Sequence, residues 1–307
     1  MSSSPLRSPS IGTPITARRA PDGFAITLMI VLCAIWGLQQ VAIKTTNAAI
    51  APMLQAGLRS AIATVLVWGW ARVRGTPLFR EDGTLFAGLL AGMLFAVEFV
   101  CIFFGLTLTS ASRMAVFLYT APCFTALGLH ALAFADGLVR APVAGTSTLA
   151  GLAGDALGVL GGALWAATTV VVRGSSLSHA SASKTLFYQL AVSAVVLLAL
   201  ACLLGKARAV HVTPLAVAGL AYQAVIVAFV SYLAWFWLLT RYKASRLSVF
   251  SFLTPLFGVG FGALLLGESI SVHFLLAAAL VLAGIVLVNA PARRASSALQ
   301  ASASGRR

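Results

Sequence analysis

Residues 163–173, ALWAATTVVVR, resemble residues 34–44, AIWGLQQVAIK, although the two stretches lie in different halves of the chain. Each match begins at a tryptophan, Trp36 or Trp165, and ends at a cationic residue, with a polar pair at the same place between them. Both stretches have the length of a helix segment and are otherwise apolar. Two such similar stretches at a large separation predict an internal duplication.

Two further matches have nearly the same spacing. Residues 111–124, ASRMAVFLYTAPCF, match residues 244–257, ASRLSVFSFLTPLF, with Ala-Ser-Arg, Val-Phe, Pro and Phe in register. Arg59 aligns with Gln189 at a similar separation. Because three separated pairs share nearly one offset, the sequence predicts two homologous halves.

The composition predicts that the duplicated unit lies in a membrane. The chain is 60% hydrophobic and only 9% charged, whereas about a quarter of the residues in an ordinary soluble domain are charged. A helix that spans a bilayer needs about 20 mostly apolar residues and satisfies its own backbone hydrogen bonds. We therefore predict an all-α polytopic membrane protein, with spans at residues 24–43, 52–71, 84–108, 112–135, 155–172, 184–204, 214–239, 246–266 and 270–289.

The net charge of +14 is distributed over short loops and tails rather than gathered in one patch. This distribution is typical of orientation signals and does not favour nucleic-acid binding. If each half has five spans and both termini are cytoplasmic, only Lys44, Arg113, Lys206 and Arg208 face the other side. Simple alternation of the clear spans would scatter cations over both sides. We therefore expect the halves to be inverted, with Arg113 outside and its counterpart Arg246 inside.

The inverted arrangement requires a fifth crossing in the first half, where the sequence is weak. Residues 137–154, GLVRAPVAGTSTLAGLAG, are interrupted by Arg140 and Pro142. A short or broken helix buried against protein and a true deletion both remain open. The predicted organisation is a disordered basic tail at 1–22, a first repeat at 23–136, the degenerate region at 137–154, a second repeat at 155–290 and a disordered basic tail at 291–307.

The paired openings, the two Ala-Ser-Arg spans and the closing LLLGE at residues 264–268 resemble EamA-type transporters of the drug/metabolite transporter superfamily, over about residues 24–290. The first half departs from the family pattern at FADGL, residues 134–138. The resemblance implies two inverted repeats, nominally ten transmembrane helices with the fifth short, broken or missing. It also implies a multi-pass protein of a bacterial inner membrane that moves a small-molecule substrate, such as an amino acid, by alternating access.

Export is the expected direction of transport. Besides the small-molecule substrate, the lipid bilayer is the only partner that we predict. A facilitator without ion coupling and a transport-defective remnant are alternatives within this interpretation. An intramembrane enzyme would need a nucleophile and a base at helical spacing, and the sequence shows no such pair. No cofactor, metal site or nucleotide-binding motif is predicted, and the sequence does not indicate an oligomeric state.

Two charged residues lie well inside predicted spans rather than at their ends, and a charge there is costly and therefore faces a cavity or a partner. Glu98 lies near the middle of its span, and Arg59 lies about two turns into its own. Glu98 is expected to bind a proton or a substrate amine, or to hydrogen-bond a neighbouring helix as a neutral carboxyl. Arg59 is expected to bind a substrate carboxylate through two nitrogens, or to pair with Glu98.

Other polar-tipped or aromatic residues inside the spans are candidates for the wall of a binding pocket, with ordinary packing as the alternative. These are Trp36, Gln40, Tyr119, Trp165, Thr169, Tyr188, Gln189, Tyr232 and Trp235.

Four residues are candidates for gating or hinge motion. Lys44 and Arg173 close equivalent spans, where a long cationic side chain either reaches the interface or guards an entrance. Pro122 and Pro255 occupy equivalent positions and predict either a static bend or a hinge. The carboxylates Asp155 and Glu268 are expected to act as helix caps or loop contacts.

Overall fold

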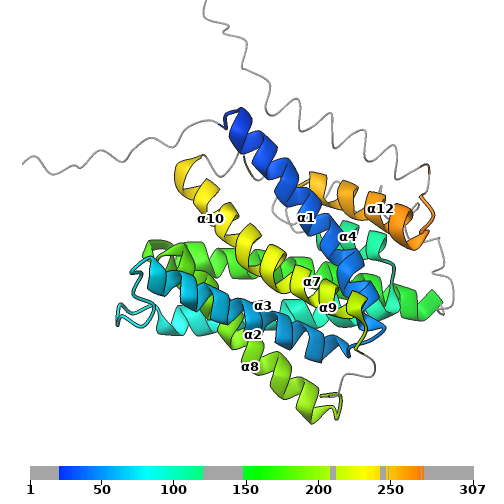
Figure 1. Ribbon diagram of the computed structural model, residues 1–307, viewed down its shortest axis with the longest axis horizontal. Coiled ribbons are helices and arrows are strands. Elements are labelled where there is room, and N and C mark those ends of the chain that lie inside the picture. Colours follow the sequence, from blue (N-terminus) through cyan, green and yellow to red (C-terminus); the bar gives the residue numbers. More distant parts are fainter. Residues whose placement is uncertain are drawn as a thin grey trace, which may run out of the picture.

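The computed structural model describes residues 21–119, 148–207, 212–242, 247, 249–270 and 272. These residues form helices and no β-strand, which confirms the predicted all-α class (Figure 1). The helices are α1 (Gly23–Asn47), α2 (Pro52–Val73), α3 (Leu85–Leu108), α4 (Ala111–Leu118), α7 (Thr148–Gly174), the 3₁₀ helix η1 (Ser176–His179), α8 (Ala182–Leu203), α9 (Pro214–Ala221), the π-helix η2 (Tyr222–Ser231), α10 (Tyr232–Arg241) and α12 (Leu253–Leu266).

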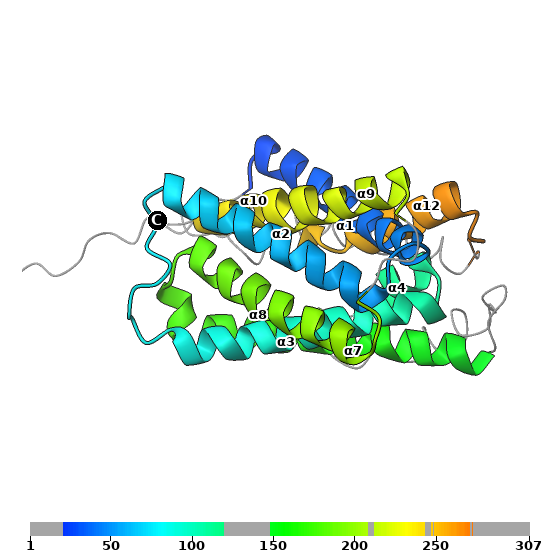
Figure 2. The same ribbon diagram turned by 60° about the horizontal axis from the view of Figure 1, so that its bottom comes forward.

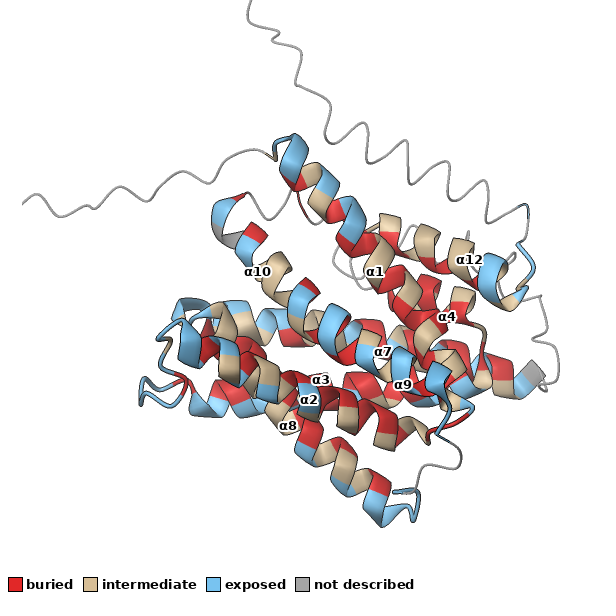
Figure 3. Ribbon diagram, viewed as in Figure 1, coloured by how far each residue is buried: buried red, intermediate tan, exposed pale blue. Residues whose placement is uncertain are grey.

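Within the described ranges, five helices are long and apolar enough to cross a membrane, namely Gly23–Asn47, Leu85–Leu108, Leu149–Gly174, Ala182–Leu203 and Pro214–Leu238. Helix α2 has a similar length but carries Gln55, Arg59 and Arg72, and α12 is apolar but shorter. The outer faces of the helices expose large apolar side chains such as Phe86, Val170, Val195 and Leu264 (Figure 3). The chain is a multi-pass membrane bundle.

Helix boundaries differ from the prediction in two places. Helix α7 begins at Thr148 rather than at residue 155, so the last part of the weak 137–154 region is helical. Pro255 lies in the first turn of α12, directly after a turn at residues 251–252 that interrupts the span predicted at 246–266. A proline is tolerated there because the first turn of a helix leaves its N–H groups unpaired. Pro122 and Arg140 lie outside the described residues.

The helices of the two halves pack against one another rather than within separate lobes. Helix α2 lies along α8, α3 lies along α7, and α1 packs on α12 and on the α9–η2 segment. Figure 2 shows α3, α7 and α8 on one side of the bundle and α1, α10 and α12 on the other. The core is therefore formed where elements from both halves meet.

Helices α2 and α8 pack antiparallel, because Gly57 lies against Leu198 and Ser60 lies against Ser193. Each has 22 residues and ends in a left-handed glycine, Gly75 with φ 64° and Gly205 with φ 65°. At both ends the residue after the glycine donates a hydrogen bond five residues back, from Thr76 N–H to Ala71 O and from Lys206 N–H to Ala201 O. This Schellman closure needs a positive φ, which glycine adopts without strain.

The closest approach between α1 and α12 occurs at Gly37 and Gly258. A Cβ atom on Gly37 would lie 2.7 Å from the backbone nitrogen of Gly258 and 2.7 Å from the Cβ of Phe257. Small residues allow membrane helices to approach at this distance. The absence of a side chain at Gly37 is thus what brings α1 and α12 together.

We expect the Gly37→Ala variant to be less stable than the wild type, because the added methyl meets backbone atoms that cannot move aside. The expected cost is about 1–3 kcal/mol, as in overpacked cores, and is measured as a lower melting temperature of the detergent-purified protein. Gly69→Ala in α2 is the matched control, since a Cβ there meets nothing within 4 Å. Equal melting temperatures for the two variants would contradict the close packing.

Candidate functional site

A buried cation and a buried carboxyl occur together near the centre of the bundle. Arg59 on α2 is fully buried, and Glu98 on α3 is 6% exposed. Arg59 Nη2 donates to Tyr232 Oη at 3.4 Å, and its guanidinium lies over the ring of Phe99, 4.1 Å from the centroid. Since Phe99 follows Glu98 in the chain, this contact places the two charged residues in one region.

Neither charged side chain is fully satisfied by its neighbours. Arg59 Nε and Nη1 and Glu98 Oε2 are buried and have no hydrogen-bond partner. Among the described residues, ion pairs join Lys44 to Glu268, Arg113 to Asp155 and Lys184 to Asp82, and none joins Arg59 to Glu98. Unmatched buried polar atoms of this kind are costly. Arg59 can therefore donate two further hydrogen bonds, and Glu98 can accept one.

Aromatic rings from both halves pack in the two apolar clusters that Tyr232, the partner of Arg59, joins. Trp36 Nε1 donates to Ser231 Oγ at 2.9 Å, and its ring meets Trp235 edge-on at 5.9 Å. Tyr119 and Trp165 form a similar edge-on pair at 5.2 Å. Tyr232, the hydrogen-bond partner of Arg59, packs against two clusters of buried apolar residues, one that contains Phe99 and one that contains Trp36. We call Arg59, Glu98, Tyr232 and the rings of Trp36, Tyr119, Trp165 and Trp235 the central group.

Some predicted pocket residues lie away from the central group. Tyr188 Oη is 3.4 Å from Thr84 Oγ1, at the start of α3. Thr169 is exposed, and its hydroxyl donates to the carbonyl of Trp165 in its own helix at 3.0 Å. Gln40 and Gln189 are buried, and Gln40 Oε1 has no hydrogen-bond partner.

Several buried polar contacts between the halves were not predicted. Gln55 Nε2 donates to Gln223 Oε1 at 3.1 Å, and the hydroxyls of Ser60 and Ser193 are 2.9 Å apart. All four residues are polar side chains in otherwise apolar stretches, and that signal would have identified them as candidates. Their pairing depends on the packing of helices from different halves, which the sequence does not reveal.

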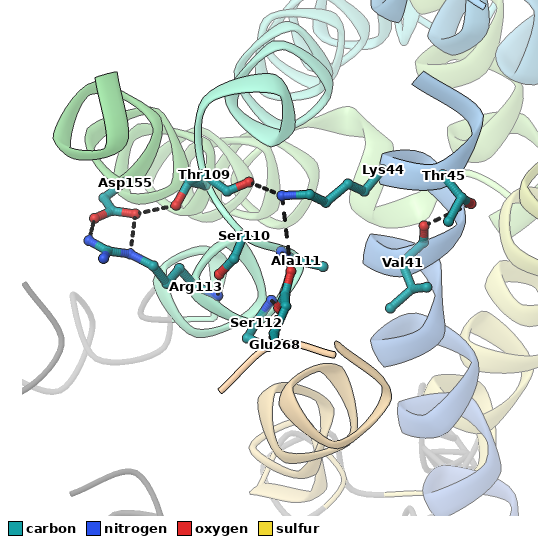
Figure 4. Close-up of polar contacts among 10 residues, drawn as sticks. All are labelled: Val41, Lys44, Thr45, Thr109, Ser110, Ala111, Ser112, Arg113, Asp155 and Glu268. Atoms are coloured by element: carbon teal, nitrogen blue, oxygen red, sulfur yellow. Dashed lines mark hydrogen bonds and ion pairs between the residues drawn. The ribbon is translucent and has the colours of Figure 1, made fainter. Parts of the chain in front are cut away.

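Charged contacts join the end of α1, the start of α4 and the segment after α12 at one end of the bundle (Figure 4). Lys44 Nζ donates to the carbonyl oxygen of Thr109 at 2.6 Å and lies 4.0 Å from Glu268 Oε1. The Glu268 carboxylate accepts hydrogen bonds from the backbone N–H groups of Ala111 and Ser112, at 2.8 and 2.9 Å. A carboxylate is favourable at a helix N-terminus, so the segment after α12 caps α4, as predicted for Glu268.

A second pair of side chains ties α4 to α7 at the same end. The guanidinium of Arg113 donates to both carboxylate oxygens of Asp155, through Nε at 3.0 Å and through Nη2. Thr109 Oγ1 donates to Asp155 Oδ1 at 2.7 Å. Asp155 is 5% exposed, so this contact is shielded. Arg173, the counterpart of Lys44, is exposed at the end of α7.

The opposite end of α3 is joined to α8 by a buried lysine. Lys184, 2% exposed, donates to both carboxylate oxygens of Asp82 at 2.9 Å and to the carbonyl of Arg80 at 2.7 Å. Thr84 Oγ1 donates to Asp82 Oδ1 at 2.6 Å. The hydrogen bonds from Thr84 and Lys184 lower the pKa of Asp82 to about 2. The loop between α2 and α3 is thereby fixed to the second half.

The described residues contain no group of three or more His, Cys, Asp or Glu side chains that could hold a metal ion. Cys33 and Cys101 are buried and Cys202 is exposed, and all three are free thiols.

Comparison with known proteins places the whole membrane region in one family. The model of the EamA-like transporter family matches residues 23–133 and 152–290. An uncharacterized transporter of Archaeoglobus fulgidus is 26% identical over 284 residues, covering 86% of this chain and 96% of the relative. The uncharacterized transporter YoaV of Bacillus subtilis is 25% identical over 269 residues, covering 82% and 92%.

The fold is also similar to that of a solved structure titled "Crystal structure of protein". The two chains superpose with a TM-score of 0.64 at 19% sequence identity, over 89% of this chain and 98% of the other. At this identity the likeness concerns the fold alone.

We expect Asp82→Asn to lower the melting temperature at pH 7, because buried Lys184 loses its counter-ion. The pKa of Asp82 is depressed from an ordinary value of 3.8 to about 2. Its stabilising contribution is therefore complete above pH 3.8 and is lost as the pH falls through about 2. The difference from the wild type stays constant between about pH 7 and pH 5 and shrinks only below about pH 4.

Melting curves of the detergent-purified protein over this pH range provide the measurement. Glu81→Gln is the matched control, since it removes the exposed neighbouring carboxylate. Equal melting temperatures of the wild type and Asp82→Asn between pH 7 and pH 5 would show that the contact with Lys184 does not stabilise the fold.

Proposed function

The chain belongs to the EamA-like transporter family, and on that premise we propose that it is a secondary exporter of small amphiphilic metabolites such as amino acids. The observation that carries this proposal is the central group, in which Arg59 and Glu98 are buried with unmatched polar atoms. The family and the transporter relatives also favour transport over an enzymatic role.

The central group suits a substrate that carries an acid and an amine. Arg59 Nε and Nη1 are buried donors without a partner, and each can give a substrate carboxylate one charge-assisted hydrogen bond. Glu98 Oε2 is a free acceptor for an ammonium group. The stack on Phe99 fixes the plane of the guanidinium. The rings of Trp36, Tyr119 and the other aromatic members provide apolar contacts for the rest of the substrate.

The proposed mechanism is alternating access between two inverted halves. Equivalent helices α1 and α7 run in opposite senses, because α1 and α3 end together at the Lys44–Thr109 contact, whereas α7 ends beside the start of α3. There, Ser176 Oγ, just after α7, donates to the carbonyl of Gly83 at 3.0 Å. Inverted repeats provide two nearly equivalent packings, each open to one side of the membrane.

The two ends of the bundle support this proposal because they differ. At one end, Lys44, Glu268 and the start of α4 are held together by charged contacts. At the other end, the equivalent cation Arg173 is exposed. We propose that the Lys44 end is the outer gate, closed in this conformation, and that both termini are cytoplasmic. Substrate then enters from the Arg173 side and leaves when the Lys44 contacts break.

We expect Arg59→Gln and Glu98→Gln to reduce exchange of an amino-acid substrate in proteoliposome counterflow by at least about tenfold each, because each removes a charge-assisted contact. The double variant should lose little more than the poorer single variant, since both residues hold one substrate. Arg241→Gln is the matched control, because Arg241 lies over the Trp237 ring at the helix end. Normal exchange by both single variants and the double variant would refute the proposed site, and no flux of any solute in the wild type would favour a defective remnant.

We expect the Lys44→Met and Glu268→Gln variants to populate the conformation that is open at the Lys44 end more than the wild type does. The reporter is a cysteine in place of buried Gln40, one turn before Lys44 on α1, in a variant without the native cysteines. Loss of about 1 kcal/mol from the closed state should raise the rate of thiol labelling about fivefold. Lys206→Met, at an exposed position at the same end of the bundle, is the control. Unchanged labelling in both gate variants would exclude this contact as a gate.

A further inference from the structure

A pocket of about 330 Å³ lies between the last turn of α2 and the loop that leads to α3. Among its lining residues are Trp68, Arg72, Thr76, Leu78, Phe79 and Arg80. Figure 2 shows this loop at one end of the bundle, between the end of α2 and the start of α3, and no residue of the central group lines the pocket. The pocket is therefore separate from the proposed transport site.

The closure of α2 explains why the pocket is cationic. Helix C-termini present free carbonyl oxygens, which disfavour anions. Here the carbonyls of Ala71 and Arg72 accept hydrogen bonds from the N–H groups of Thr76 and Gly75, at 2.8 and 3.2 Å. The left-handed conformation of Gly75 makes this turn possible. With those carbonyls occupied, the charged groups at the pocket are the side chains of Arg72 and Arg80.

The arginines are oriented in a way that leaves hydrogen-bond donors free. The Arg72 guanidinium lies over the Trp68 ring at 5.0 Å, and Arg74 lies over Trp70 at 4.8 Å. Stacking uses the face of the guanidinium, whereas its N–H groups point outward from the edge. Such a stacked guanidinium is held in place and can still donate two parallel hydrogen bonds to a phosphate.

Among the residues that the structure describes, no carboxylate lines the pocket to compete for these donors. The nearest acidic residues in the chain are Glu81 and Asp82. Asp82 accepts hydrogen bonds from Lys184 and Thr84 and is directed toward α8. Glu81 is exposed. Within the described part of the chain, no side chain forms an ion pair with Arg72 or Arg80, so the pocket keeps their positive charge.

The apolar side of the pocket favours an amphiphile over a soluble anion. Trp68 is 41% exposed and Phe79 is 73% exposed, while Leu78 is buried at 6%. Tryptophan and arginine side chains at the end of a membrane helix are typical of the interface between lipid and water. Basic pockets at that depth attract anionic headgroups. A free phosphate would leave the exposed Trp68 and Phe79 rings unused.

We propose that this pocket binds the headgroup of an anionic phospholipid. Arg72 and Arg80 hold the phosphate oxygens, and Trp68 and Phe79 contact the glycerol and the upper acyl chain. The loop lies on the side that is cytoplasmic in the proposed orientation, where anionic lipid attracts basic residues. Lipid binding here does not depend on the transport proposal.

The test uses the full chain in an uncharged detergent, titrated with brominated phosphatidylglycerol, whose bromine atoms quench nearby tryptophans. We expect saturable quenching that is much weaker with brominated phosphatidylcholine. The Arg72→Gln/Arg80→Gln variant should raise the Kd for phosphatidylglycerol by at least about tenfold, since two charge-assisted contacts are lost. Arg80→Gln alone, at an exposed side chain that leaves the fold intact, should raise it about threefold.

Arg241→Gln is the matched control, because it removes an arginine stacked on Trp237 at 4.8 Å, outside the pocket. Its Kd should equal that of the wild type. Three results would overturn the proposal. The first is equal affinity for the two lipids, and the second is wild-type affinity for phosphatidylglycerol in both Arg80→Gln and the double variant. The third is displacement of the lipid by millimolar inorganic phosphate. The last result would assign the pocket to a soluble anion.

Discussion

The fold depends on one constraint, the burial of Arg59 in a helix that lies among apolar surroundings. A guanidinium cannot face lipid at that depth without a large cost, so α2 must be covered by other helices. The structure covers it with α8 along its length and with η2 and α3 beside it. The neutral polar residues Gln55 and Ser60 of α2 are covered in the same manner, since both hydrogen-bond to residues of the second half. The polar face of α2 thus determines which helices meet at the centre.

Charged contacts are divided between the ends and the centre in a way that suits two conformations. Near the ends of the bundle, the ion pairs Arg113–Asp155 and Lys184–Asp82 link elements of different halves. In each of these pairs the carboxylate also accepts a hydrogen bond from a threonine hydroxyl, Thr109 for Asp155 and Thr84 for Asp82. At the centre, the cation and the carboxyl are buried and incompletely satisfied. In the proposed mechanism, a bound substrate supplies the hydrogen bonds that Arg59 and Glu98 lack.

The spans predicted at 24–43, 84–108, 155–172, 184–204 and 214–239 coincide with helices long and apolar enough to cross a membrane, because hydropathy does not depend on packing. The sequence also identifies Arg59 and Glu98, since an intramembrane charge stands out against apolar neighbours. It does not predict helix faces, because these helices are apolar nearly all round. Thr169 was therefore a candidate although it is exposed, and Gln55 was overlooked although it is fully buried. Contacts such as Lys44 to Glu268 depend on how helices of the two halves pack against each other, which the sequence does not reveal.

The π-helix η2 shows why the register of the central group could not be derived from spacing. It occupies Tyr222–Ser231 between α9 and α10, and its wider turns rotate every residue that follows relative to a continuous α-helix. Both of its ends are anchored to the first half. Tyr222 Oη donates to the carbonyl of Ile35 at 2.8 Å, and Ser231 Oγ accepts from Trp36. Tyr232 comes directly after the second anchor, so its hydroxyl reaches Arg59 only because the π-helical register brings it there.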